Sequence, residues 1–366
     1  MDSVIEKVDI INANLQESLN KLARRESFED FKIDTKEIAQ DGNNYIAILK
    51  EVTVKLTKNR EDKQLELFVK VNGPDVAVEF LSVSEVYNKE LFTGLTLSKL
   101  YEDLQEGYIP YEERYKFIKY YEESSTDFII MENMKKKGFT IQNRLEVISL
   151  QYAELCIKQL AKFHALSYVL KKKQPNYYGK AINTIKHPLK LDAVWDVFLD
   201  KMARSNLEHL DNIARTKLEN SIPDLLKKYK YYLKNPDNIK CLCHGDFKAS
   251  NILQKVEDDA VTEVIPIDYQ LIHSGCPVLD FLYFIFISTD RDFRRKHLED
   301  LKNGYFNTVK KFLTFFSIDV EDLNLIEDNK YPDLTRLSEA KICCKSDRLK
   351  YRIRGVVQDF IDWGYL

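Results

Sequence analysis

The sequence predicts an α+β fold in two unequal parts, a small part built on an antiparallel sheet and a larger, mainly helical part. Three observations lead to this prediction. The chain has 366 residues, whereas a single hydrophobic core stops growing at about 250–300 residues. Apolar residues make up 44% of the chain, enough for a sizeable interior. Strand-like apolar runs gather early in the chain, and helical periodicity dominates the remainder.

The smaller part is expected to begin with a helix and to continue as an antiparallel meander. Residues 2–25 place apolar side chains three, four and seven positions apart, which is the pattern of an amphipathic helix. Residues 75–105 show helical periodicity as well. Five runs rich in Val, Ile, Leu and aromatic residues are bounded by turn signals or charged residues. The predicted strands are residues 31–40, 45–56, 65–71, 109–123 and 127–133.

The larger part is expected to be mostly helical. Its predicted helices are residues 145–171, 189–233 and 290–316, with strand-like pieces at 241–246, 251–256 and 261–270. The basic run that ends at Gly138 is the predicted linker between the two parts. The sequence therefore predicts domains at residues 1–134 and 135–366.

Composition narrows the class of partner. The chain carries 55 Lys and Arg against 58 Asp and Glu, so no summed positive field favours nucleic acid or an anionic membrane. Six cysteines without zinc-like spacing indicate reduced thiols. The N-terminus lacks a signal-peptide pattern, and the apolar run 281–287 is too short to span a bilayer. A cytoplasmic protein with a small-molecule partner is expected, and nothing in the sequence predicts its oligomeric state.

The most informative stretch is CLCHGDFKASNIL at 241–253, followed by VIPIDYQ at 264–270. Asn251 follows Asp246 by five residues, so one loop can carry both, and Asp268 ends an apolar strand that can face them. Mg²⁺ takes hard oxygen ligands and usually only one or two carboxylates. The pattern predicts a phosphoryl-transfer site in which Asp246 is the general base and Asn251 and Asp268 hold the metal ion.

Two neighbours of the predicted base have separate roles. Lys248 is a candidate catalytic cation for the γ-phosphate, because phosphoryl transfer depends on alignment and charge neutralisation. His244, immediately before a glycine, is more typical of a buried hydrogen-bonding brace than of an acid or base.

Lys70 lies in the middle of an apolar strand, where an unpaired ammonium group is costly. Glu90 in the following helix is the favoured partner, with Glu85 and Glu79 as competitors. Lys70 can also reach the α- and β-phosphates of ATP. The alternative is that Lys70 points outward, because the apolar alternation around it is imperfect.

Two further segments are candidate nucleotide contacts. The backbone N–H groups of the turn containing Gly42, Asn43 and Asn44 can cover phosphates, although a single glycine in a hairpin is usually only a turn. Glu132 and Met134 belong to the stretch 131–134 that ends a strand at the boundary of the two parts, where backbone groups can pair with adenine.

These motifs resemble the protein-kinase-like superfamily, on the branch with aminoglycoside phosphotransferases and choline kinases. The sequence is most similar to the insect ecdysteroid kinase-like, or CHK kinase-like, family. The motifs that carry the resemblance are NNYIAIL, LFVKV, FIIMENM, LAKFHALSY, LCHGDFKASNIL, VIPIDYQ and GCPVLDFLYFIF, which occur in the family's order. Two departures are Phe247-Lys248, where many members have Leu-Trp, and Tyr269, where Phe is commoner.

The resemblance implies a bilobal protein-kinase-like fold that uses ATP and Mg²⁺. It implies that residues 1–134 bind the nucleotide and that residues 135–366 carry catalysis and the acceptor. By the same similarity Asp246 is the base, Asn251 and Asp268 hold metal, Lys70 and Glu90 form the nucleotide-side pair, and residues 132–134 meet adenine. Asp280 matches a structural Asp that braces the catalytic loop.

The function expected from this resemblance is transfer of the γ-phosphate of ATP to a hydroxyl of a small molecule, an ecdysteroid or another hydroxylated metabolite or xenobiotic. One alternative is a choline or ethanolamine kinase. It requires an aromatic and acidic cage, for which Trp195, Asp196 and the Tyr-rich stretches at 177–178 and 230–232 are candidates. The other alternative is a non-catalytic, pseudokinase-type binding protein.

Overall fold

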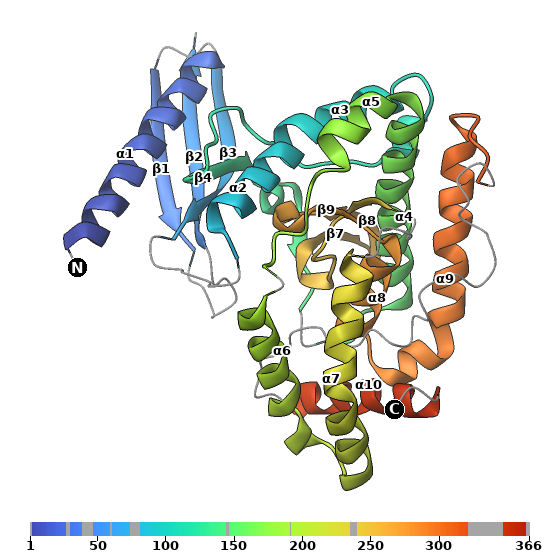
Figure 1. Ribbon diagram of the computed structural model, residues 1–366. Helices are drawn as coiled ribbons and strands as arrows, with labels where there is room; N and C mark the ends of the chain where they lie inside the picture. The colour runs from blue at the N-terminus through green and yellow to red at the C-terminus, as the bar shows by residue number, and fades with distance from the viewer. Residues whose placement is uncertain are drawn as a thin grey trace. The chain divides into compact units, whose positions relative to one another are not determined.

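The structure is a computed structural model, described for residues 2–26, 30–38, 47–58, 61–73, 81–143, 146–190, 192–234, 240–320 and 347–363. Contacts between Cα atoms divide the chain into two compact units (Figure 1). Unit 1 consists of Met1–Asp103 and Lys116–Thr140, and unit 2 of Leu104–Tyr115 and Ile141–Leu366.

Unit 1 contains a four-stranded antiparallel sheet in the order β1-β2-β3-β4 (Figure 1). Its elements are α1 (Asp2–Arg25), β1 (Asp30–Glu37), β2 (Ala47–Lys58), β3 (Glu61–Asn72) and β4 (Phe128–Glu132). Apolar side chains of α1, Leu15 and Leu19 among them, share a buried core with Val52 of β2 and Leu67 of β3. The predicted N-terminal helix and four of the five predicted strands are confirmed.

A continuous helical segment lies between β3 and β4. It consists of α2 (Val83–Leu91), a π-helical turn η1 (Phe92–Leu97) and α3 (Ser98–Gln105). Gly94 sits in the π-helical turn, and a Cβ atom there would lie 2.3 Å from the ring of Tyr120. Glycine at this position lets the aromatic ring pack directly on the helix backbone.

The strand predicted at 109–123 is wrong. The segment contains a single 3₁₀ turn, η2 (Tyr111–Glu113), and an isolated bridge between Tyr120 and Met131. Gln105 supplies hydrogen bonds that a ladder would otherwise provide, because its side-chain amide accepts from the N–H of Tyr115 at 2.6 Å and donates to its carbonyl at 3.1 Å. Pro110 also lacks the N–H that a central strand needs. The apolar pattern of this segment reflects burial, and its backbone pairing with β4 is limited to residues 119–121.

Unit 2 is mainly helical and contains short strands around a polar loop. Its strands are β6 (Cys241–Cys243), paired antiparallel with β9 (His273–Gly275), and the hairpin of β7 (Ile252–Glu257) and β8 (Ala260–Pro266). The short strand β5 (Phe139–Ile141) and the 3₁₀ turn η3 (Met134–Lys137) lie at the boundary of the two units. The α+β prediction, with a small antiparallel sheet and a larger helical part, is therefore confirmed.

Long helices enclose these strands. They are α4 (Leu150–Lys173), α8 (Pro277–Ser288) and α9 (Arg291–Thr314), with α4 and α9 side by side (Figure 1). Helix α4 begins later than the predicted residue 145, because Ser149 caps it by accepting from the N–H of Tyr152 at 3.2 Å. The predicted helix at 290–316 is confirmed as α9, which Asp290 caps.

The remaining helices of unit 2 are α5 (Pro175–Tyr177), η4 (Tyr178–Ile182), α6 (Ala193–Ser205), η5 (Leu207–His209), α7 (Asn212–Lys234) and α10 (Asp347–Asp362). A satellite core is formed by α6, η5, α7 and α10. The predicted helix 189–233 is thus two helices, because the N–H of Ala214 bonds to Asp211 and a new helix starts there. Ile353 and Val357 of α10 pack on α7 through Leu218. Among the described residues, no helix is long and apolar enough to cross a bilayer.

Candidate active site

A tight loop connects β6 to β7 and carries the predicted catalytic residues. Gly245, in the His-Gly-Asp triplet, has a φ of +82°, in the left-handed region that glycine adopts without strain. A Cβ atom at this position would lie 2.3 Å from the backbone oxygen of Leu271. The loop therefore needs glycine here both for its turn and for its close approach to the chain that follows β8.

Asp280, in the first turn of α8, holds the main chain of this loop. Its Oδ2 accepts from the N–H of His244 at 2.6 Å, and its Oδ1 accepts from the N–H of Gly245 at 2.9 Å. His164 of α4 lies with Nε2 at 3.1 Å from the same Oδ2. Burial alone would raise the pKa of Asp280, but the hydrogen bond and charge of His164 hold that pKa below its usual range. These contacts are those of a brace.

His244 is buried, and both of its ring nitrogens are hydrogen-bonded. Nε2 lies 3.0 Å from the carbonyl oxygen of Ile267 and must donate to it, whereas Nδ1 accepts from the N–H of Asp246 at 3.3 Å. One neutral tautomer satisfies both bonds. Burial lowers the pKa of His244, although nearby carboxylates favour the charged form. His244 thus supports the loop as a neutral ring, as the sequence predicted.

Asp246 presents its carboxylate to donors from three different residues. Lys248 Nζ lies 3.0 Å from Oδ1 and 2.8 Å from Oδ2. Tyr283 of α8 donates its hydroxyl to Oδ1 at 2.7 Å, and Asn251 donates its amide Nδ2 to Oδ2 at 2.9 Å. The side chain of Asp246 is 9% exposed, whereas that of Lys248 is 29% exposed. The carboxylate is therefore fixed by two firmly placed neutral donors and by one cation that reaches solvent.

The two predicted metal ligands lie side by side at the base of the β7–β8 hairpin. Ile252 pairs with Pro266 in that hairpin, and the N–H of Ile267 donates to the carbonyl of Asn251 at 2.9 Å. The strand register therefore places Asp268 next to Asn251. Asp268 adopts a left-handed backbone with φ +67°, a strained conformation that tends to occur at functional sites.

Phe247, one of the two positions that depart from the family pattern, is buried. Its ring lies 5.4 Å from that of Phe284 and 5.6 Å from that of His244, centroid to centroid. The aromatic residue therefore packs into the interior beneath the loop, and Lys248 alone of this pair contacts the carboxylate of Asp246.

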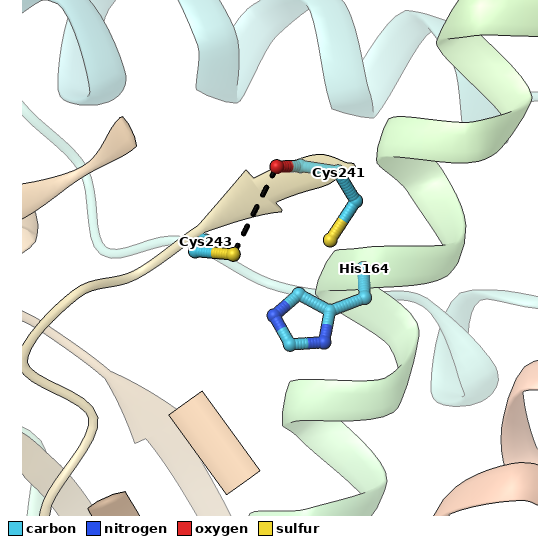
Figure 2. A group of neighbouring side chains, drawn as sticks. All are labelled: His164, Cys241 and Cys243. Carbon is cyan, nitrogen blue, oxygen red and sulfur yellow. Dashed lines mark hydrogen bonds between the residues drawn. The ribbon is translucent and has the colours of Figure 1, made fainter. Parts of the chain in front are cut away.

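A buried group of three side chains lies beneath the loop (Figure 2). His164, Cys241 and Cys243 bring one nitrogen and two sulfur atoms within 4.8 Å of one another, a donor set that suits zinc. His164 is already engaged on both nitrogens, with Tyr305 OH 2.7 Å from Nδ1 and Asp280 at Nε2. Burial opposes its charge, but Cys241 and Asp280 together raise the pKa of His164. Because both ring nitrogens are already hydrogen-bonded, neither is open to a metal ion, and we interpret the group as part of the brace.

In unit 1, Lys70 of β3 pairs with Glu90 of α2. Lys70 Nζ lies 2.7 Å from Glu90 Oε2, and both residues are buried. The ammonium also lies 5.8 Å from the ring centroid of Tyr87. Glu85, a competing partner in the prediction, instead pairs with Lys89 at 3.3 Å. Lys70 therefore points inward and uses the favoured partner, and Glu79 lies outside the described residues.

The other candidate nucleotide contacts are described in part. Met134 is buried, and the carboxylate of Glu132 accepts from the N–H of Lys119 at 2.8 Å and pairs with Lys137. Their role in adenine binding stays a prediction. The predicted phosphate-covering turn, with Gly42, Asn43 and Asn44, lies outside the described residues.

The candidate cation cage residues have separate surroundings. Trp195 is buried, and its ring stacks on Phe198 at 5.5 Å between centroids. Tyr178 is buried with its hydroxyl 3.4 Å from Ser167, whereas Tyr231 is 60% exposed. The contacts given for Trp195, Tyr178 and Tyr231 therefore do not join these three residues in one aromatic cage.

The sequence-based search missed three residues that contact the site, namely His164, Tyr283 and Tyr305. Spacing carried a signal for one of them, because Tyr283 follows Asp280 by three residues and therefore lies on the same face of α8. His164 and Tyr305 come from helices far away in the sequence, and only the tertiary fold brings His164 to Asp280 and Tyr305 to His164.

Comparison with known proteins identifies one matching family. A model of the ecdysteroid kinase-like family matches residues 41–317, a range that takes in Lys70, Glu90 and the whole loop around Asp246. A search of curated proteins finds no match.

Solved structures of low sequence identity are also similar. A type VIII aminoglycoside-3'-phosphotransferase is 14% identical, with a TM-score of 0.36, 95% of this chain covered and 99% of its own. An aminoglycoside phosphotransferase from Streptomyces rimosus is 12% identical, with a TM-score of 0.34 and coverage of 89% and 92%. Glucosamine kinase in complex with glucosamine, ADP and inorganic phosphate is 12% identical, with a TM-score of 0.41 and coverage of 90% and 76%.

Proposed function

Because the chain belongs to the ecdysteroid kinase-like family, we propose that it is an ATP-dependent phosphotransferase acting on a hydroxyl group of a small molecule. The observation that carries this proposal is the surroundings of Asp246. A buried carboxylate is held in one orientation by Tyr283 and Asn251, beside the oxygen-bearing pair Asn251 and Asp268. A general base and an adjacent set of oxygen ligands are the two parts that phosphoryl transfer requires.

In the proposed reaction, the hydroxyl oxygen of the acceptor attacks the γ-phosphorus of ATP. Its O–P bond forms while the bond from the γ-phosphorus to the β,γ-bridging oxygen breaks. The hydroxyl proton passes to Asp246, and ADP leaves with the electron pair of the broken bond. Asp246 contributes by orienting the hydroxyl and accepting its proton, a role worth roughly 10²–10⁴-fold in rate.

The donor set fits Mg²⁺, the metal ion implied by the family. Asn251 uses its amide nitrogen on Asp246, which turns its amide oxygen away from that carboxylate. Asp268 adds a second hard oxygen donor, oriented by Gln270 Nε2 at 3.2 Å. Asn251 and Asp268 are thus the residues that would hold Mg²⁺, which neutralises phosphate charge when bound.

Lys248 is the proposed cation for the transferred phosphate. Its ammonium occupies both oxygens of Asp246, and a substrate hydroxyl needs one of those positions. The lysine side chain is long and flexible, and it is 29% exposed. A phosphate group that draws Lys248 away frees Asp246 for the acceptor. In unit 1, Lys70 is the proposed contact for the α- and β-phosphates, with Glu90 holding it in place.

An ecdysteroid, or another hydroxylated metabolite or xenobiotic, is the proposed acceptor class. Family membership is the support for this part of the proposal. The net charge of −3 argues for a small-molecule acceptor over nucleic acid.

The test is transfer of labelled phosphate from ATP to a panel of ecdysteroids, phenolic compounds, glycosides and choline, with and without Mg²⁺. Turnover of a hydroxylated acceptor that requires Mg²⁺ is the expected result. If choline is the one compound phosphorylated, the proposed acceptor class is wrong and the protein is a choline kinase. No turnover, together with a rise in melting temperature on adding Mg²⁺-ATP, would indicate a binding protein. No turnover and no shift would refute the proposal.

A further inference from the structure

One face of helix α8 follows the catalytic loop from start to end. Asp280 binds the N–H groups of His244 and Gly245, and Ser288 Oγ accepts from the N–H of Ala249 at 3.2 Å. Phe284 packs against Phe247 in the same interval. Positions 280, 283, 284 and 288 share one side of an α-helix, so they meet successive parts of the loop.

Tyr283 lies between these contacts and is the member of this face that reaches the reactive carboxylate. Its hydroxyl donates to Asp246 Oδ1 at 2.7 Å, a length typical of a strong O–H···O bond. Asn251 donates to the other oxygen, Oδ2, at 2.9 Å. Two neutral donors on opposite oxygens fix the rotation of the carboxylate about its Cβ–Cγ bond.

The number of hydrogen bonds that the carboxylate of Asp246 can accept shows why the Tyr283 hydroxyl is important. A carboxylate offers about four lone-pair positions, and Lys248, Tyr283 and Asn251 together make four contacts with the two oxygens. An acceptor hydroxyl therefore has to replace a donor. If Lys248 leaves, Tyr283 and Asn251 remain to hold the carboxylate, one on each oxygen.

We propose that Tyr283 is a positioning residue for phosphoryl transfer, which holds Asp246 through Oδ1 while Lys248 gives up its place to the acceptor hydroxyl. This inference rests on the proposed function. Tyr283 does not exchange a proton with the substrate. Tyr283 keeps the carboxylate of Asp246 oriented toward the incoming hydroxyl after Lys248 has moved away.

The test compares Tyr283→Phe with Tyr351→Phe. Tyr351, on α10, also donates its hydroxyl to an aspartate, Asp292, at 3.1 Å, but on an exposed surface. Both changes remove one hydroxyl group. For each protein we would measure kcat and KM for ATP and for the best acceptor, basal ATP hydrolysis and melting temperature.

Tyr283→Phe is expected to lower kcat about tenfold, the usual value of a hydrogen bond to a charged group. KM for ATP and the melting temperature should be unchanged. Tyr351→Phe should match the wild type in every measurement.

The outcomes separate this inference from the proposed function. A wild type that turns over, together with an unchanged kcat in Tyr283→Phe, would overturn the positioning role alone. A rise in the acceptor KM at constant kcat would overturn it in favour of a substrate contact. A wild type with neither transfer nor ATP hydrolysis would remove the proposed function and this inference with it.

Discussion

Unit 1 and unit 2 hold their candidate functional charges in different ways. In unit 1 Lys70 of β3 and Glu90 of α2 form an ion pair across 2.7 Å. In unit 2 the carboxylate of Asp280 alone receives hydrogen bonds from two backbone N–H groups and a histidine. The Lys70–Glu90 pair joins two elements through one side-chain contact, whereas Asp280 joins α8 to the loop through two main-chain N–H groups at once. The comparison predicts an adjustable nucleotide-side pair and a rigid catalytic loop.

The largest expected effect is on catalysis in unit 2. Asp246→Asn should lower kcat by roughly 10²–10⁴-fold, because the amide cannot accept the hydroxyl proton. Mg²⁺-ATP binding and melting temperature should stay close to wild type. Steady-state kinetics and calorimetric nucleotide titration would measure this. The control is Asp200→Asn, which changes an exposed carboxylate that pairs with Arg204; equal losses in the two variants would refute the role of Asp246.

The rigidity of the loop is tested by removing its brace. Asp280→Ala leaves the N–H groups of His244 and Gly245 and the ring of His164 without their acceptor. We expect a loss of about 3–5 kcal/mol in unfolding free energy. Urea denaturation followed by fluorescence measures it, with Asp300→Ala on the exposed face of α9 as control. A loss below about 1 kcal/mol would show that the loop does not depend on Asp280.

The pair in unit 1 is tested with a double-mutant cycle. Lys70→Met leaves the carboxylate of Glu90 buried without its cation, and we expect a loss of about 3 kcal/mol in unfolding free energy. Adding Glu90→Leu should recover most of that loss, since two apolar residues replace the pair. Both variants should bind ATP more weakly. If the double variant is no more stable than Lys70→Met, the unpaired carboxylate of Glu90 is not the cause of the lost unfolding free energy.

The smallest expected effect is in the pH dependence of stability and comes from the two histidines beside Asp280. The pKa of His164 is raised above 6.5, chiefly by Cys241 and Asp280 against burial, so its stabilisation is present below pH 6.5 and is lost as pH rises through the folded pKa. Burial lowers the pKa of His244, so its contribution is lost as pH falls below 6.5. Denaturation between pH 5.5 and 8.5 should show both declines.

Two variants distinguish the decline in stability above pH 6.5 from the decline below it. His164→Gln should remove the decline above pH 6.5, and His244→Gln should remove the decline below it. Identical pH profiles in the wild type and both variants would contradict the opposite pKa shifts of His164 and His244.

Regular elements and the catalytic triplet were predictable from sequence because their signals are local. Each of these signals is carried by residues close together in the sequence. Examples are the periodicity of residues 2–25, the turn residues between strands and the His-Gly-Asp motif. Glu90 was also the favoured partner of Lys70, and the structure places the two in contact.

The contacts that the sequence did not reveal are set by the tertiary fold. Gln105 replaces strand pairing for Tyr115, and nothing in the apolar pattern of 109–123 distinguishes that arrangement from a ladder. Tyr283 is surrounded in the sequence by Leu and Phe, so it reads as a core aromatic until α8 is placed against the loop. Tyr305 meets His164 across 141 residues, a separation that no local pattern encodes.

That last contact also bears on how the protein is made. The brace of the catalytic loop joins His164, Asp280 and Tyr305, and the chain must be synthesised beyond residue 305 before all three can meet. Contacts so far apart in sequence form late, because the entropy of closing the intervening chain has to be offset first. A nascent chain arrested after the β7–β8 hairpin would therefore contain the whole His-Gly-Asp motif and both metal-ligand candidates, and would still lack a formed catalytic loop.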